Sequence, residues 1–205
     1  MMLVNGTVRK FTERVASFAP APGGGGASAL VGSLGIALGN MVGELTIHKP
    51  KYADVAEEVK ELMVRAQDLR KRLLDCVDKD AAGFTPLFMA YSIPKEDPNR
   101  EAEIEKCLRG AAAVPLEIFD LCCESIELQR DFADKGSKLV ISDAATGVEL
   151  CRGALYGAAV NVKVNTKLMK DRAYAAELDR HVDAALEKYG AMADKIFDDV
   201  YQRYC

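Results

Sequence analysis

Four consecutive glycines, Gly23, Gly24, Gly25 and Gly26, followed closely by the hydroxyl of Ser28, are the residues best able to bind a ligand through the main chain. Glycine has no Cβ, so a ligand can approach its backbone closely. The apolar segment after the glycines predicts a helix that starts near Ala27, and the first amides of a helix have no internal acceptors. Together with the helix dipole, these amides favour an anion or a polarised oxygen.

Alternative roles of the glycine run are weaker or stay open. A phosphate loop or a dinucleotide fingerprint would need a following Lys and hydroxyl residue, or a preceding strand, and the sequence has neither. The absence of charged residues between Arg14 and Glu44 would fit a membrane-spanning helix. However, the segment is rich in Gly, Ala and Ser and contains Asn40, so its insertion into a membrane would release little free energy. A flexible surface linker remains an alternative.

Glycines on two predicted helices suggest a close helix contact. Gly35, Gly39 and Gly43 repeat at four-residue steps after the glycine run. Gly147, Gly153 and Gly157 form a second face of small residues, which is a candidate partner for the first. We therefore expect long helices that pack closely through Gly and Ala faces.

Helical periodicity extends over almost the whole chain, so the predicted fold class is all-α, a bundle of long, partly kinked helices. Gly83 and Pro86 are expected to bend or interrupt the helix that follows Pro50, and Pro115 to kink the next one without breaking it. Only "KLVIS" suggests an extended run. The further helices are expected over about 100–132, 143–165 and 170–204.

Composition limits the classes of protein. A length of 205 residues can bury a core, and we treat 1–205 as a single domain. A net charge of −4 gives no general attraction to nucleic acid or to an anionic membrane. The six cysteines form no CxxC pair, which favours reduced thiols in a cytoplasmic protein, and no metal site is expected.

Four motifs in register resemble the cyclodeaminase/cyclohydrolase family. "APAPGGGGASALVGSLGIALGNMV" is similar to the family signature, and the resemblance covers nearly the whole chain. The other three motifs are an aspartate-containing helix, a proline-kinked helix and a Ser-Asp helix with two asparagines: "LLDCVDKDAAGFTPLFMAYSIPK", "AAAVPLEIFDLC" and "ISDAATGVELCRGALYGAAVNVKVN".

This resemblance implies an all-helical subunit that forms a homodimer, with a tetrahydrofolate derivative bound near the interface and no cofactor. Its substrates carry a one-carbon unit between two folate nitrogens, and a nearby carboxylate can stabilise the cation and transfer protons. Nothing in the sequence resembles a formiminotransferase, so a separate glutamate formiminotransferase chain is a possible partner.

Two aspartates are the candidate catalytic groups. Asp143 is the first choice, because it follows Ser142 at a predicted helix start and belongs to the Ser-Asp motif of the resemblance. Capping of that helix is the structural alternative, since Ser and Asp are favoured capping residues. Asp80 is the second choice, and a solvated helix carboxylate is its alternative.

Besides the glycine run and Ser28, the candidate substrate-binding residues are Ser142, two amides and two lysines. Asn161 and Asn165 lie on one helix face and could contact the pterin ring, or could bond to neighbouring helices instead. Lys163 could receive the glutamate carboxylates of folate, or belong to a solvated basic patch. The resemblance adds Lys95 as a contact.

The resemblance implies a formimidoyltetrahydrofolate cyclodeaminase as the first choice, because the bifunctional relatives share these motifs; such an enzyme releases ammonia and forms 5,10-methenyltetrahydrofolate. A methenyltetrahydrofolate cyclohydrolase, which adds water to that compound, is the alternative enzyme. A helical scaffold or interaction protein without activity is the alternative from another class.

Overall fold

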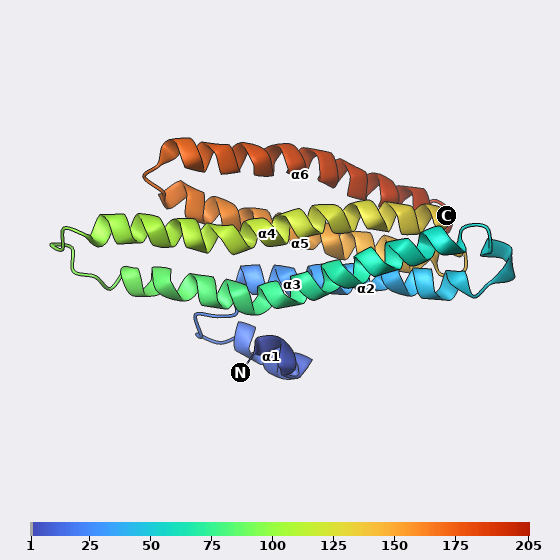
Figure 1. Ribbon diagram of the computed structural model, residues 1–205, viewed down its shortest axis with the longest axis horizontal. Coiled ribbons are helices and arrows are strands. Elements are labelled where there is room, and N and C mark those ends of the chain that lie inside the picture. Colours follow the sequence, from blue (N-terminus) through green and yellow to red (C-terminus); the bar gives the residue numbers. More distant parts are fainter. Residues whose placement is uncertain (1) are drawn as a thin grey trace.

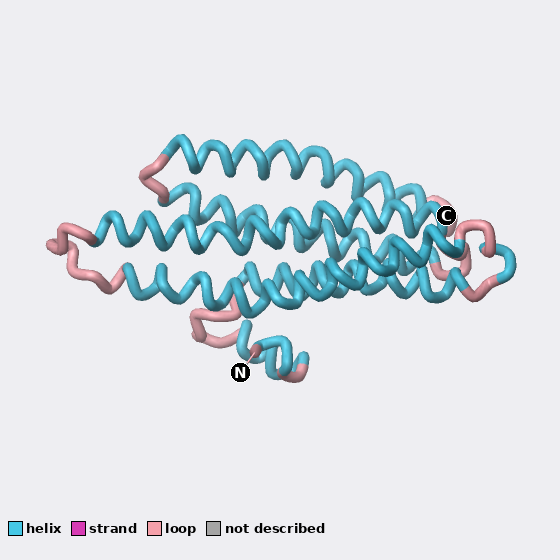
Figure 2. The backbone as a smooth tube through the Cα atoms, in the orientation of Figure 1, coloured by secondary structure: helices cyan, strands magenta, loops and turns pink. Residues whose placement is uncertain are grey.

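Long helices lying side by side make up the molecule. The structure, a computed structural model, describes residues 2–205. Five long helices form an elongated bundle, and a short one lies outside it near the N-terminus (Figure 1). Figure 2 shows only helices and loops, and residues 2–205 contain no strand, so the all-α prediction is confirmed. The helices are α1 (Val8–Val15), α2 (Gly24–Ile47), α3 (Ala56–Ala90), α4 (Arg100–Lys135), α5 (Ile141–Leu168) and α6 (Arg172–Tyr201), with short 3-10 turns at Leu3–Asn5 and Pro50–Tyr52.

Helix α2 packs against α3, α4 and α5. Its backbone comes so close to α5 that a Cβ added to Gly35 would lie 2.8 Å from the carbonyl oxygen of Gly147. A Cβ on Gly157 would collide with Ser28. Gly153, in contrast, has nothing within 4 Å of such a Cβ. The absence of side chains at Gly35 and Gly147 therefore sets the spacing of these two helices.

Helix α2 is the one helix in the described chain that is long and apolar enough to cross a membrane. Its side chains Ile36 and Val42 are fully buried within the bundle and belong to the main hydrophobic core. Burial against neighbouring helices explains its apolar composition without a lipid environment.

Two helices were expected to be disturbed by an internal proline. Helix α4 continues through Pro115, as predicted. Gly83 and Pro86 were expected to bend or interrupt α3, and they do not interrupt it, because α3 is one helix from Ala56 to Ala90. Pro86 lacks the N–H that would bond to Ala82, but both residues are exposed, so water can satisfy the freed carbonyl.

Several predicted boundaries also move. Helix α2 begins at Gly24 instead of near Ala27, since the Ala27 amide already donates to the carbonyl oxygen of Gly23 at 3.0 Å. The segment "KLVIS" forms no strand: it turns, and α5 starts at Ile141, whose side chain is buried in the main core. The glycines are therefore the first turn of the helix itself.

A second, smaller hydrophobic cluster holds one end of the bundle together. It brings Leu87 of α3 and Leu108 of α4 against Met169 and Ala175, which flank the turn between α5 and α6. These four residues are at most 3% exposed. The cluster fixes the ends of four helices next to the start of α2.

Candidate active site

The start of α2 forms one wall of a pocket of about 240 Å³ between α3, α4 and α5. The chain reaches it from α1 through the segment 16–23, which also contributes to the wall. Four separate parts of the sequence thus meet at one point, and the lining residues are Pro20, Ala21, Gly23, Gly24, Gly25, Asp80, Ala81, Phe84, Ala111, Pro115, Asn161 and Asn165.

Asp80 is the one ionisable side chain that lines this pocket. Its Oδ2 accepts a hydrogen bond of 2.9 Å from the amide of Gly26. A Cβ on Gly25 would lie 2.6 Å from the same Oδ2, so only glycine leaves room for the carboxyl group at this position. Burial raises the pKa of Asp80 above the ordinary 3.8, and the hydrogen bond from Gly26 opposes part of that increase. Asp80 is therefore a carboxylate suited to accept a proton.

The remaining amides of this helix start are open. Gly23 precedes the helix, and its carbonyl already accepts from Ala27. Within residues 2–205, the amides of Gly24 and Gly25 meet no acceptor. Both residues line the pocket. The pocket therefore offers a proton acceptor and two open donors side by side.

Asn161 and Asn165 also line the pocket, and each donates to the backbone. Asn161 Nδ2 donates to the carbonyl oxygen of Gly157 at 2.8 Å. Asn165 Nδ2 donates to Asn161 at 2.9 Å and to Ala111 at 3.2 Å. Pro115 has no N–H, so the carbonyl of Ala111 lacks its usual helix partner, and Asn165 supplies one. Both side chains thus bond to helix backbone and also line the pocket, and their contact with a ligand stays a prediction.

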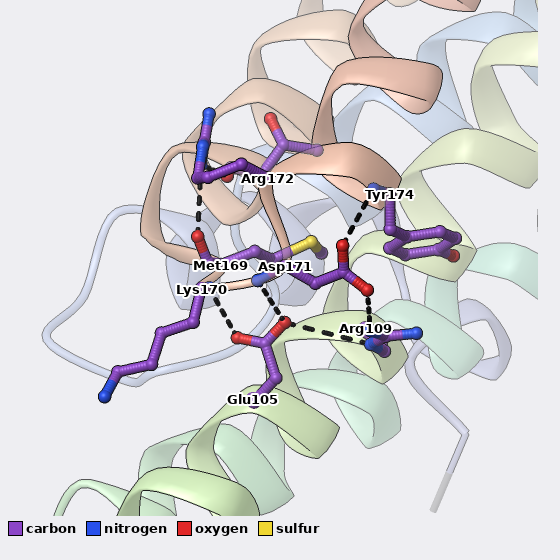
Figure 3. Close-up of polar contacts among 8 residues, drawn as sticks. Glu105, Arg109, Met169, Lys170, Asp171, Arg172 and Tyr174 are labelled. Atoms are coloured by element: carbon purple, nitrogen blue, oxygen red, sulfur yellow. Dashed lines mark hydrogen bonds and ion pairs between the residues drawn. The ribbon is translucent and has the colours of Figure 1, made fainter.

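A polar cluster at the turn between α5 and α6 anchors this end of α5 to α4 (Figure 3). Glu105 accepts from the amides of Lys170 and Asp171, at 2.7 and 3.2 Å. Asp171 caps α6 by accepting from Tyr174 N, and pairs with Arg109 at 2.6 Å. These bonds tie the turn to the helix that carries Ala111 and Pro115. The two asparagine residues are held by a fixed helix end.

Asp143 and Ser142 do not lie at this pocket within one subunit. Both belong to the first turn of α5, where Ser142 is exposed and Asp143 is partly buried. Along α5, Asp143 lies about 27 Å from Asn161. The predicted partnership of Asp143 with the glycine run is therefore not formed in a single chain, and the N-cap position is occupied by Val140.

Three further predicted binding residues also lie away from the pocket lining. Lys163 points to α6, where its Nζ lies 2.8 Å from Asp183. Lys95 is exposed in the loop between α3 and α4. Ser28 is buried, and its hydroxyl donates to the carbonyl oxygen of Gly24 at 2.8 Å. This bond stabilises the first turn of α2.

Some lining residues were not predicted. Phe84 lies four residues after Asp80 on α3, so the helical period places both side chains on one face. Pro115 was noted only as a kink, although a proline inside a helix also frees a carbonyl four residues earlier. Pro20 and Ala21 belong to the quoted signature, but that pattern did not predict their place in the wall, because their position depends on how the linker folds back on the bundle.

Known proteins are similar to this chain over most of its length. The family model described as formiminotransferase-cyclodeaminase matches residues 7–184. A methenyltetrahydrofolate cyclohydrolase of Methylorubrum extorquens is 38% identical over 97% of this chain and 98% of its own. The rat formimidoyltransferase-cyclodeaminase is 26% identical, and the match spans 38% of its length.

A solved structure has the same arrangement of helices. The crystal structure of formiminotetrahydrofolate cyclodeaminase from Thermotoga maritima superposes with a TM-score of 0.84, at 26% identity, covering 96% of this chain and 98% of that one. The match therefore covers nearly all of the described bundle. By family model, sequence and fold, the chain belongs to the formiminotransferase-cyclodeaminase family of folate one-carbon enzymes.

Proposed function

We propose that this protein is a methenyltetrahydrofolate cyclohydrolase, which converts 5,10-methenyltetrahydrofolate and water into 10-formyltetrahydrofolate. The observation that carries the proposal is the half-buried carboxyl of Asp80 beside the open amides of Gly24 and Gly25. The relative from Methylorubrum extorquens supports the choice, because it is similar over the full length of both chains.

In the proposed reaction, Asp80 acts as a general base. It removes a proton from water while the water oxygen forms a bond to the methenyl carbon, which is a cation held between two nitrogens. The raised pKa of Asp80 makes its carboxylate a stronger base than an exposed aspartate. Negative charge on the same carboxylate also stabilises the cationic substrate before attack.

Collapse of the tetrahedral adduct needs a second proton transfer. The bond from the carbon to N5 breaks and N5 takes the proton that Asp80 holds. The hydroxyl group of the adduct releases its remaining proton to water, and its oxygen becomes the formyl carbonyl. The amides of Gly24 and Gly25 can donate to that oxygen as charge develops on it. The electrophile is already a cation, so this scheme assigns no role to a metal or nucleotide cofactor.

A formimidoyltetrahydrofolate cyclodeaminase is the second candidate, favoured by the similar structure from Thermotoga maritima. Here N10 of the folate attacks the formimidoyl carbon, Asp80 accepts the N10 proton, and the amine leaves as ammonia after protonation. The same pocket would serve both reactions. The two differ in whether water or a folate nitrogen attacks, and a separate formiminotransferase chain would be a partner only in this second case.

We include in the proposal a homodimer in the cytoplasm. The outward face of α2 supports the dimer, because Leu34, Met41 and Leu45 are exposed there by 53%, 37% and 44%. An exposed apolar stripe of this kind is typical of a contact surface. Free thiols at all six cysteines, five of them buried, support a reducing compartment.

Absorbance measurements separate the two enzymes. Purified protein is mixed with 5,10-methenyltetrahydrofolate, and the loss of its near-ultraviolet absorbance is compared with the spontaneous rate. The formimidoyl compound is tested in parallel for a gain of that absorbance. Faster loss with no gain supports the cyclohydrolase, and a gain supports the cyclodeaminase. Rates equal to the spontaneous ones in both assays would leave the helical scaffold as the better account.

A further inference from the structure

Two phenylalanine side chains extend the pocket along the surface of α3. Phe84 lines the pocket and is 39% exposed, and Phe88, one turn further, is 54% exposed. Their ring centroids lie 6.3 Å apart with the planes inclined by 39°. Neither ring belongs to the two hydrophobic clusters of the bundle. Folding therefore gives no reason for this exposed aromatic pair.

The size of the pocket suggests a binding role for this exposed aromatic pair. At about 240 Å³ the pocket is smaller than the ~300 to 1,000 Å³ that sites for small molecules usually have. It is suited to the pteridine ring system and the reacting carbon. In the proposed substrate, N10 is bonded to that carbon and is also the amino nitrogen of the aminobenzoyl group. This ring must then begin at the mouth of the pocket.

We propose that Phe84 and Phe88 form the subsite for the aminobenzoyl ring of the folate. The inference rests on the proposed function for the identity of the substrate, and it adds a binding group outside the pocket. Phe84 contacts the ring at the pocket mouth, and Phe88 packs against its outer part by offset or edge-to-face stacking. Ligand binding covers apolar surface that is exposed in the free protein.

The test uses Phe88→Leu, with Met89→Leu as a matched control on the next residue of the same helix, which is 62% exposed. Calorimetry measures the affinity of each protein for 5-formyltetrahydrofolate and for a 5-formyltetrahydropterin without the aminobenzoylglutamate. We expect Phe88→Leu to weaken the first ligand about five-fold, the effect of losing one aromatic contact, and to leave the second unchanged. In turnover, KM should rise while kcat stays the same, and Met89→Leu should change neither quantity.

Three results would overturn the inference. Unchanged affinity of Phe88→Leu for the folate would show that its ring makes no contact, and equal weakening of both ligands would show an effect on the pteridine site instead. In these two cases, turnover by the unmodified protein would keep the proposed function in place. If that protein binds neither ligand and turns over neither substrate, the inference and the proposed function both fail.

Discussion

The two ends of α5 carry the two candidate carboxylates in very different surroundings. At one end Asn161 and Asn165 face Asp80, which is half-buried, accepts from Gly26 and has a raised pKa. At the other end Asp143 stands in the first turn of its own helix. Burial and the absence of a nearby cation make a carboxylate reactive, and Asp80 combines a raised pKa from burial with a pocket lining that contains no cationic side chain.

The first turns of α5 and α2 also differ in their charge. Helix α5 begins with its own acidic residue, Asp143, which complements the positive end of the dipole. Helix α2 begins with glycines and has no acidic residue in its first turn, so a carboxylate from α3 approaches it instead. Gly24 and Gly25 stay open to a ligand. A helix start that is left bare can bind substrate, whereas one that carries its own charge is already stabilised.

The largest expected effect comes from Asp80→Asn. The amide can still accept from Gly26 but cannot take a proton, so kcat/KM for hydrolysis should fall about 10²- to 10⁴-fold, the usual contribution of a general base. Steady-state kinetics with 5,10-methenyltetrahydrofolate measure this.

Thermal unfolding provides the control for that variant. Burial disfavours the charged form of Asp80, so above its native pKa a neutral amide removes an unfavourable contribution, and the melting temperature at neutral pH should not fall. A stable Asp80→Asn protein with full activity would remove Asp80 from the mechanism.

A smaller loss is expected from Gly25→Ala. The added Cβ would lie 2.6 Å from Oδ2 of Asp80, so the carboxyl group must shift. A displacement of about 1 Å at a reacting group lowers turnover about 100-fold. Gly153→Ala is the matched control, because nothing lies within 4 Å of its Cβ, and its kcat/KM should stay at the original value. Equal activity of the two variants would mean that the contact between Gly25 and Asp80 is not used.

The smallest effect is expected from Asp143→Asn. Loss of a carboxylate from the first turn of α5 should cost about 0.5 kcal/mol and lower the melting temperature by about 1 to 2 °C. The value of kcat/KM should change less than about two-fold, in the range of substitutions outside a site. A loss as large as that of Asp80→Asn would reverse the comparison, and would indicate that Asp143 of a second copy enters the pocket.

Local sequence patterns predicted the helices well, but they predicted only some of the residues that come together in the tertiary structure. Three glycines of the run, 23–25, and the pair Asn161 and Asn165 were predicted to bind. All of them line the pocket, and each signal is local to one helix. The position of Asp143 depends on which end of α5 meets α2, and no local pattern contains that information. Lys163 is a similar case, since its ion pair with Asp183 forms only after α6 folds back.

The role of proline shows the same limit. Pro86 and Pro115 have the same chemistry, yet one lies on an exposed face and the other in a wall of the pocket. Exposure lets water satisfy the carbonyl freed by Pro86, whereas the carbonyl freed by Pro115 is taken by Asn165. The partner comes from another helix, so only the tertiary structure reveals it.

The pH dependence of kcat/KM tests most directly whether Asp80 is the base. Its native pKa is raised, and the carboxylate is the active form, so the rate should fall as the pH is lowered through a value above 3.8. Asp80→Asn should retain only a slow reaction without that acid limb. An unmodified protein whose rate stays constant down to pH 3.8, or an Asp80→Asn protein with the same acid limb, would contradict the account.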